Sequence, residues 1–410
     1  MSQSIRQAAV TSTPSPSLAQ VQSPRLPTAE TLLPYLARID ETRWYSNRGE
    51  LVQRLERRLN ALFSGGASEA TSLLVTASTG SAAIEAAVLA AAGRATPERP
   101  LALMPSYTFV ATALSVIRCG YRPYFVDVDP ETWTLDPDAI AAHPHLAEAG
   151  LVMPVTAYGR VPDMRGWERV HAATGVPVVV DAAPAFEPFV RDPGLVSATV
   201  PAALSFHATK SFSTAEGGAV LWRDESRLFQ VAQISCFGVT DQRLCLFEGF
   251  NGKLSEYHAA MGLACLDEWT RREDAYARIA AAYRGGDTAP DQAGTIVATP
   301  EVSAAYVILD SPNAAVSHLA EQRLAARGIG TRRWYGMGLH RQPAFADAPH
   351  DPLPVTEELT LRHLGLPAAI DLTDEDIAFV LHTLNGNHAG GGETRIGATA
   401  GTTPRQPRYG

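Results

Sequence analysis

A lysine and an aspartate each stand after an apolar run that reads as a buried strand. Asp181 directly follows VPVVV, and Lys210 lies in the polar segment SFHATKSFSTAEGG. A lone lysine in a loop is usually a solvated surface residue, and an aspartate after a strand is commonly a turn cap. A lysine surrounded by small hydrogen-bonding side chains, however, can lose its proton and attack an aldehyde carbon. A buried carboxylate needs a cation or a hydrogen-bond donor, and a protonated heteroaromatic nitrogen supplies both.

A candidate phosphate site precedes both residues in the chain. The segment Thr79-Gly80-Ser81 stands between the strand-like run SLLVTAS and an Ala-rich helical run. Backbone N–H groups and the Ser81 hydroxyl at the start of a helix favour an anion. Small residues with a Ser or Thr cap open many helices, so this feature alone is weak evidence. The segment is neither a Walker loop nor a GxGxxG fingerprint.

An aromatic segment completes the set. MPSYTFVAT offers Tyr107 and Phe109 after another strand, where a flat cofactor could stack, although core packing is the commoner role of a single ring. The four features occur in the order expected of a site for pyridoxal 5'-phosphate (PLP). That cofactor needs an anion site, a ring contact, an acid at its ring nitrogen and a Schiff-base lysine. The sequence therefore predicts a PLP enzyme with Lys210 and Asp181 as its catalytic residues.

The elements that position these residues alternate between strand and helix. Short apolar runs separated by helices predict an α/β fold with a mostly parallel sheet covered on both faces. We expect one long helix or a helix pair from 255 to 283. It should be followed by a few strands, one of them at 303–310, and by helices at 316–327 and 374–384. The strands of the sheet are expected at 72–78, 101–105, 122–128, 150–155, 176–181, 202–206 and 218–222, with helices at 80–92, 111–120 and 164–174.

The length of 410 residues exceeds what one hydrophobic core usually supports and predicts two lobes. We expect a large PLP-binding α/β domain with an N-terminal arm over residues 27–265. A smaller C-terminal α+β domain is expected over 266–385. Residues 1–26 are rich in Ser, Pro, Thr and Gln, and residues 386–410 in Gly and Thr. Both ends are therefore expected to be disordered.

Composition excludes several classes of partner. The net charge is -9 and no run of Lys or Arg forms a stripe, which disfavours nucleic acid and anionic membranes. No apolar stretch approaches the roughly 20 residues that cross a bilayer, and the first residues do not resemble a secretory signal. The four cysteines show no metal-ligand spacing. We expect a cytoplasmic protein without a metal site.

Longer motifs around these residues resemble the DegT/DnrJ/EryC1/StrS family of PLP-dependent sugar aminotransferases. The resemblance runs from about residue 44 to residue 384. It is carried by the motifs TGSAAIEAAVLAA, PSYTFVAT, FVDVDPETWTLDP, PVVVDAAPAF, SFHATKSFSTAEGGAV and GFNGKLSEYHAAMGLACLD. The resemblance implies fold type I, in which a large domain has a mostly parallel seven-stranded sheet flanked by helices, with a smaller C-terminal α+β domain.

The resemblance also implies a role for each site residue. Lys210 would form the Schiff base with PLP, and Asp181 would bind the pyridinium nitrogen. Phe109 would lie over the ring. Asn251 would reach the phosphate from the neighbouring subunit, with Lys253 possible as an added positive charge, so the active unit would be a homodimer with a shared site. The residues implied to bind the cofactor are Gly80, Ser81, Phe109, Asp181, Pro184, Ser205, Lys210 and Asn251.

Two positions depart from the family pattern. The residue that directly follows DAA is commonly Gln or His and touches the cofactor, whereas here it is Pro184, which has no side-chain donor. The usual His of the PVHxYG segment is replaced by Thr156 in PVTAYG. Neither position is the lysine or the aspartate, so PLP binding is still expected. The departures affect the expected substrate and reaction instead.

The implied reaction is transfer of an amino group from Glu or Gln to a keto-sugar, usually nucleotide-linked. Amination of a keto-cyclitol or similar precursor is an alternative. So is a sugar dehydratase, but family dehydratases replace the Schiff-base lysine with His. A catalytically inactive sensor or scaffold is a further alternative, which would need neither Lys210 nor Asp181. Candidate sugar contacts, for which a structural role is equally plausible, are the segment 44–49, Arg332, Arg333, Tyr335 and His340.

Overall fold

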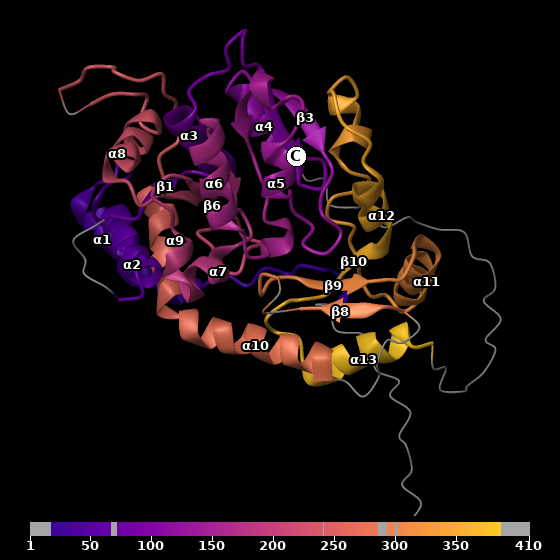
Figure 1. The fold of residues 1–410 in the computed structure, drawn as a ribbon. Coiled ribbons are helices and arrows are strands. Elements are labelled where there is room, and N and C mark those ends of the chain that lie inside the picture. The colour runs from indigo at the N-terminus through magenta and orange to yellow at the C-terminus, as the bar shows by residue number, and fades with distance from the viewer. Residues whose placement is uncertain are drawn as a thin grey trace, which may run out of the picture.

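A computed structural model describes residues 18–66, 72–240, 242–285, 293–298, 300 and 302–386 (Figure 1). A central sheet forms the middle of the large lobe. Its strands are β1 (Leu74–Ala77), β2 (Leu101–Pro105), β3 (Arg122–Val126), β4 (Ala149–Val152), β5 (Val180–Asp181), β6 (Ala202–Ser205) and β7 (Gly218–Leu221).

The sheet consists of two ladders, β3-β2-β4 and β1-β7-β6-β5. Parallel bridges from Val152 to Val178 and from Val155 to Asp181 join β4 to the chain around β5. The seven strands therefore lie in the order β3-β2-β4-β5-β6-β7-β1. Strand β7 pairs antiparallel with both of its neighbours, and every other adjacent pair is parallel. The predicted mostly parallel, seven-stranded sheet is confirmed.

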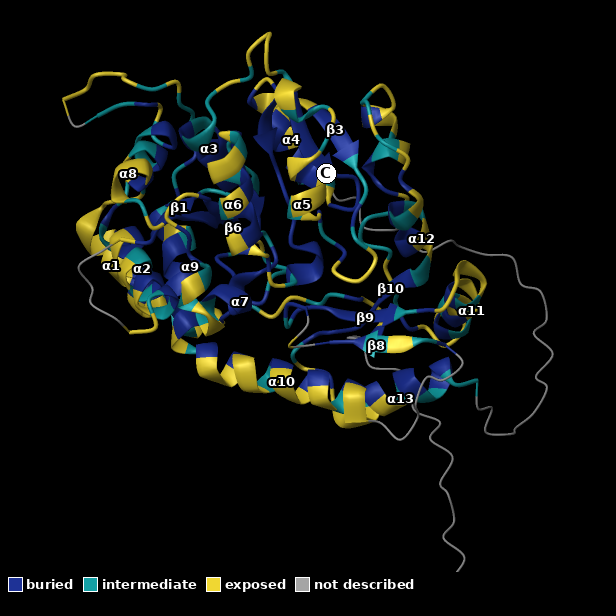
Figure 2. Cartoon of the chain, viewed as in Figure 1, coloured by how far each residue is buried: buried dark blue, intermediate teal, exposed yellow. Residues whose placement is uncertain are grey.

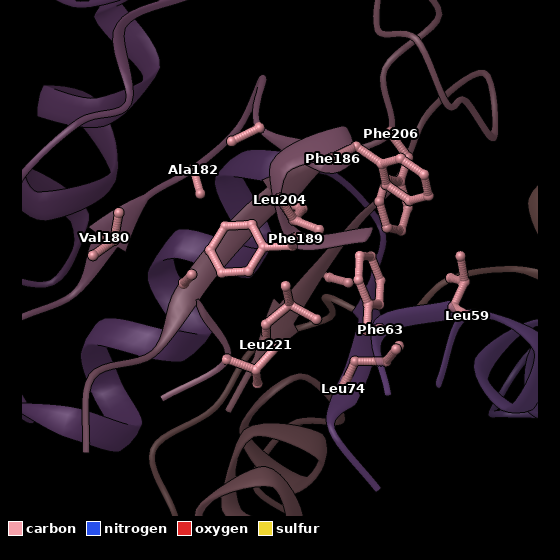
Figure 3. Close-up of a cluster of buried hydrophobic side chains, with 14 of the residues drawn as sticks. Leu59, Phe63, Leu74, Val180, Ala182, Phe186, Phe189, Leu204, Phe206 and Leu221 are labelled. Carbon is pink, nitrogen blue, oxygen red and sulfur yellow. The ribbon is translucent and has the colours of Figure 1, made fainter. Parts of the chain in front are cut away.

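Helices cover both faces of this sheet, as the short apolar strands require. Successive residues alternate between the two layers, so Val178 and Val180 join one core and Val179 joins the other. The first layer contains Phe63, Phe186 and a row of strand side chains (Figure 3). Its helices are α1 (Ala29–Thr42), α2 (Glu50–Phe63), α5 (Pro137–Ala141), α6 (Met164–Thr174), α7 (Phe186–Arg191) and α9 (Glu256–Asp267), and those of the second layer are α3 (Gly80–Ala91), α4 (Val110–Arg118) and α8 (Glu225–Ile234).

The small lobe has a three-stranded antiparallel sheet in the order β10-β9-β8. Helices α10 and α13 lie along one side of it (Figure 1), and its core contains Ile279, Leu309, Leu364 and Val380. The α+β prediction for this part is confirmed in kind, while the boundary at residue 265 stays a prediction. Its elements are α10 (Trp269–Gly285), β8 (Thr295–Val297), β9 (Val307–Asp310), α11 (Ala314–Ala325), α12 (Pro354–Arg362), β10 (His363–Leu366) and α13 (Asp374–Leu384).

Short 3-10 helices connect some of these elements. Among the described residues, no helix is both long and apolar enough to cross a membrane. The outer surface of the helices is exposed, whereas the strands of the central sheet are mostly buried (Figure 2). The 3-10 segments are Leu146–Glu148, Ala157–Gly159, Pro193–Leu195, Leu339–Arg341 and Pro343–Phe345.

Residues 18–26 differ from the predicted disorder. Leu18 is 1% exposed and belongs to the core of the small lobe. The Leu18 carbonyl accepts from Gly330 N at 2.8 Å, and the Val21 carbonyl accepts from Ala368 N at 3.1 Å. Composition suggested a flexible lead, but two apolar side chains and these backbone bonds fix this segment. The predicted disorder of residues 1–17 and 387–410 lies outside the described residues.

Candidate active site

Asp181 and Lys210 are brought together at the carboxyl end of the central sheet. Asp181 is the last residue of β5, and Lys210 lies in the connection between β6 and β7. This connection continues the antiparallel pairing, because Phe206 N donates to Gly217 O and Ala208 N to Ala215 O, both at 2.8 Å. Lys210 is therefore presented by a β-hairpin in the middle of the sheet. Ligands of open α/β sheets bind at this edge.

The Asp181 carboxyl group is buried, with 4% of the residue exposed. The Thr112 hydroxyl donates to Oδ2 at 2.7 Å, and Ala183 N donates to Oδ1 at 3.0 Å. Burial raises the pKa of Asp181, while these two hydrogen bonds and the positive charge of Lys210 act in the opposite direction. The position of the carboxyl group is thus fixed by α4 and by its own backbone. A buried carboxyl group held in this way suits a cationic partner.

Lys210 reaches the small lobe through its amine. Nζ donates to the Tyr306 hydroxyl oxygen at 3.1 Å and lies 5.7 Å from the centre of the same ring. Lysine is rare in this chain: of 34 basic residues only Lys210 and Lys253 are lysines. The two lysines therefore stand out against a surface whose positive charge comes from arginine. A guanidinium does not form the imine with an aldehyde that an amine forms, which makes the lysine at 210 chemically specific.

The candidate phosphate site forms where α3 begins beside β6. The Thr79 hydroxyl caps α3 by accepting from Ala82 N at 3.0 Å. A Cβ at Gly80 would lie 2.7 Å from Ser205 Cβ, so only glycine permits this approach. Ser81 lies in the first turn, where backbone N–H groups lack helical partners. Gly80 thus lies against Ser205, with Ser81 next in the chain, and their binding of a phosphate stays a prediction.

Phe109 and Tyr107 have different surroundings. Phe109 precedes α4 and is 60% exposed, so its ring is accessible to a ligand. Tyr107 is 1% exposed, and its hydroxyl contacts Tyr158 Oη at 3.1 Å and His363 Nδ1 at 2.5 Å. The first ring is therefore available for stacking, and the second belongs to the contact between the lobes.

The two departures from the family pattern lie next to Asp181. Thr156 N donates to the Asp181 carbonyl at 3.0 Å, so the backbone of Thr156 joins the chain after β4 to the end of β5. Pro184 is buried, and its carbonyl would be 2.6 Å from a Cβ at Gly159.

Asn251 is exposed, and its Oδ1 accepts from Lys253 Nζ at 2.5 Å. The contact of Asn251 with a second subunit stays a prediction.

The candidate sugar contacts fall into two groups. Arg333 bonds to Glu321 Oε2 at 3.1 Å and to the Leu361 carbonyl at 2.7 Å, so its guanidinium is engaged within the small lobe. The Tyr335 hydroxyl accepts from Tyr158 N at 3.0 Å, and His340 Nδ1 pairs with Ser106 Oγ at 2.7 Å. These three residues serve internal packing in this structure. The second group is nearer the surface. Arg332 is exposed, and its guanidinium carbon lies 5.0 Å from the centre of the Trp334 ring. Arg48, in the segment 44–49, forms an ion pair with Glu56 at 2.7 Å.

Three residues that the sequence analysis did not select also belong to the site. Thr112 donates to Asp181, Tyr306 contacts Lys210, and Glu187 holds the turn before Tyr306 by accepting from Ala304 N at 3.0 Å. Thr112 follows Phe109 by three residues, a spacing that places it one helical turn further on. Tyr306 lies 96 residues after Lys210 and carries no local signal.

These residues fit PLP. Asp181 has no salt bridge within 4.0 Å among the described residues, yet its carboxyl group is fully enclosed, and a pyridinium N–H would complete its hydrogen bonding. The helix start at Gly80 and Ser81 suits a phosphate. Lys210 supplies the amine. No cluster of three or more His, Cys, Asp or Glu residues that could hold a metal ion occurs in the described part of the chain.

The fold and site define a fold-type-I PLP enzyme. Residues 28–385 match the DegT/DnrJ/EryC1/StrS aminotransferase family. The chain belongs to this family, and it is a PLP-dependent aminotransferase.

The chain is also similar to individual proteins. Protein Rv3402c of Mycobacterium tuberculosis is 29% identical over 370 residues, which is 87% of each chain. The dTDP-4-amino-4,6-dideoxy-D-glucose transaminase of Shigella dysenteriae is 35% identical over 257 residues, covering 60% of this chain and 64% of the relative. The structure resembles DesI, solved in the presence of its TDP-sugar product, with a TM-score of 0.76, 29% identity and coverage of 92% and 94%.

Proposed function

We propose that the enzyme transfers an amino group from Glu or Gln to a keto-sugar that is linked to a nucleotide. The observation that carries the transfer chemistry is the placement of Lys210 and Asp181 at one edge of the sheet. The sugar class is supported by the relatives from Shigella dysenteriae and by DesI, whose names refer to dTDP- and TDP-sugars. Amino-sugar, glycan or natural-product biosynthesis would use such a reaction.

Each residue has a proposed part in the reaction. PLP, when bound, supplies an electron sink for negative charge at a substrate carbon. Asp181 keeps a proton on the ring nitrogen by accepting its N–H. Lys210 anchors the cofactor covalently and, when its amine is free, removes the proton from the α-carbon of the donor. Gly80, Ser81 and Ser205 bind the phosphate, Phe109 covers the ring, and Pro184 contacts the cofactor three residues after Asp181.

A second subunit is part of this proposal. The hairpin-like segment before Asn251 exposes Phe237, Leu244 and Leu246 by 49%, 52% and 62%. Exposed apolar side chains gathered on one segment are typical of a protein contact. A homodimer would bury them and carry Asn251 and Lys253 to the phosphate of the neighbouring site. The cytoplasm stays the predicted location.

The alternatives are less well supported. A dehydratase of this family would lack the lysine that stands at 210, and an inactive scaffold would not need a buried, hydrogen-bonded Asp181. Amination of a keto-cyclitol uses the same chemistry and differs only in the acceptor. The acceptor must therefore be identified by experiment.

The test is a screen of keto-sugar nucleotides with glutamate or glutamine as donor. We expect release of 2-oxoglutarate, or of its amide when glutamine is the donor, with one dTDP- or UDP-linked ketone. A keto-cyclitol in the same screen is the competing acceptor. Turnover of the cyclitol alone would overturn the sugar assignment, and a purified protein that takes up no PLP would overturn the function as a whole.

A further inference from the structure

Tyr306 is the small-lobe side chain that contacts the reacting amine. Its hydroxyl oxygen lies 3.1 Å from Lys210 Nζ, and only 8% of the residue is exposed. We propose that Tyr306 is a catalytic residue that holds the free amine of Lys210 in place, and that Glu187 is a positioning residue that fixes Tyr306. This inference rests on the proposed function, because it assigns a partner to the amine of that same site.

The ring of Tyr306 is fixed by other aromatic rings. It packs edge-on against Trp334, with ring centres 5.2 Å apart, and against Tyr158 at 5.7 Å. Edge-to-face contacts of this kind stabilise one orientation of a ring. The hydroxyl group therefore has a defined position before the lysine reaches it.

The backbone of Tyr306 is fixed by a turn against the large lobe. Tyr306 N donates to the Ser303 carbonyl at 2.9 Å, and Ser303 N donates to the Tyr158 carbonyl at 2.7 Å. Gly159 has a φ of +86°, and a Cβ there would lie 2.6 Å from Ser303 Cβ. Glycine at 159 thus permits both the left-handed backbone and the close approach of the turn.

Glu187 is the buried group that holds this turn. It is 7% exposed, and its carboxyl group accepts from Ala304 N at 3.0 Å and from Ser303 Oγ at 3.1 Å. Burial raises the pKa of Glu187, whereas these hydrogen bonds act in the opposite direction. A buried carboxyl group is costly without such donors. Its three contacts with two consecutive residues, Ser303 and Ala304, indicate that it orients the turn.

The contact matters because the lysine must alternate between attachment to the cofactor and a free state. A free lysine side chain has four rotatable bonds and loses much conformational entropy when it is ordered. By accepting one N–H of Nζ, the Tyr306 hydroxyl would restrict the amine without using its lone pair. The lone pair then remains available to attack the cofactor aldehyde or to take a proton.

Rapid mixing of cofactor-free protein with PLP tests the role of Tyr306. We expect Tyr306→Phe to slow the absorbance change that reports bond formation with Lys210 by about tenfold, the factor of one lost hydrogen bond. Pyridoxamine phosphate has no aldehyde and cannot form the covalent bond with Lys210, so its affinity should change less than about twofold. Tyr283→Phe is the matched control, since it also removes a buried hydroxyl, which donates to the Pro367 carbonyl at 2.8 Å away from Lys210.

Glu187 is tested in the same assay. Glu187→Ala should slow attachment in the same direction, and Glu187→Gln should restore most of the rate because its amide oxygen still accepts from Ala304 N. If Glu187→Ala does not fold, Ser303→Ala removes the two contacts of the Ser303 hydroxyl, keeps the one from Ala304 N, and should give a smaller slowing. Attachment at the wild-type rate in Tyr306→Phe, or an equal loss of pyridoxamine phosphate affinity, overturns the inference. If the wild-type protein binds neither cofactor form, the proposed function fails instead.

Discussion

At the scale of single residues, burial of the Asp181 carboxyl group lowers the stability of the cofactor-free protein but prepares the group to bind a ligand. Its pKa in the folded state is raised by burial, so the folded protein favours the protonated form more than the unfolded chain does. The stability contributed by that protonation is present below the ordinary Asp pKa and is lost as the pH rises through the raised value. At neutral pH, burial of this carboxyl group therefore lowers the stability of the cofactor-free protein relative to acid pH.

Asp181→Asn should consequently stabilise the cofactor-free protein at pH 7 by roughly 1–3 kcal/mol, the usual desolvation cost of an incompletely paired buried group. The gain should shrink as the pH falls through the Asp181 pKa. Thermal unfolding with and without PLP measures both effects. PLP should raise the melting temperature of the wild type more than that of Asp181→Asn, and the opposite order would contradict the assigned role.

Thr112 is expected to tune the same carboxyl group. Thr112→Val keeps the shape of the side chain but removes the hydroxyl that donates to Asp181 at 2.7 Å. A hydrogen bond to a charged group is worth about 1.5–3 kcal/mol, so PLP affinity should fall about 10- to 100-fold. Thr112→Ser keeps the hydroxyl and should restore most of the affinity in a fluorescence titration. Equal affinities of the Val and Ser variants would show that the hydroxyl is not required.

The sequence predicted the residues of the site better than their partners. Asp181, Lys210 and Gly80 could be selected because strand ends and helix starts are local patterns, whereas Ser205 was selected through the family resemblance. The contact of Thr112 with Asp181 depends on how α4 lies across the sheet. Tyr306 depends on the docking of a second lobe, which no local pattern in the sequence encodes.

At the scale of elements, the apolar strands and capped helices were the most predictable. The helices Met164–Thr174 and Asp374–Leu384 and the strand Leu101–Pro105 have the predicted bounds. Further strands were expected in the small lobe, but the positions of β8 and β10 were not predicted, because three or four residues become a strand only through pairing with β9. Helix α1 contains Pro34, which obscures its pattern.

The N-terminal segment is the element that composition misjudged, and its contribution can be measured. Leu18→Ala removes a side chain that is 1% exposed and should destabilise the small lobe by about 2 kcal/mol or more. Leu33→Ala removes the same atoms from a side chain that is 60% exposed and should change stability by less than about 0.5 kcal/mol. Urea unfolding of both variants decides the matter, and equal midpoints would mean that residues 18–26 do not stabilise the fold.

At the scale of the whole molecule, the proposed shared site makes activity a property of two chains. Lys210→Ala and Asn251→Ala should each be nearly inactive alone, since each damages every site of its own homodimer. When the two variants exchange subunits, one site of each mixed dimer carries both intact residues. About a quarter of wild-type activity should then return if exchange is random. Activity that stays absent after exchange, verified by mass, would place both residues in one chain's site, whereas an Asn251→Ala homodimer with full activity would show that Asn251 has no role.

The antiparallel strand β7 has a mechanical consequence for the lysine. Because Lys210 lies on a hairpin whose two strands both have partners in the sheet, the backbone at this position cannot swing outward as an ordinary loop does. The amide of Lys210 donates to the His207 carbonyl at 2.9 Å within the turn, so it should exchange with solvent only when this turn opens. Movement of Lys210 during catalysis is thereby restricted to torsions of its side chain, while its backbone stays in place.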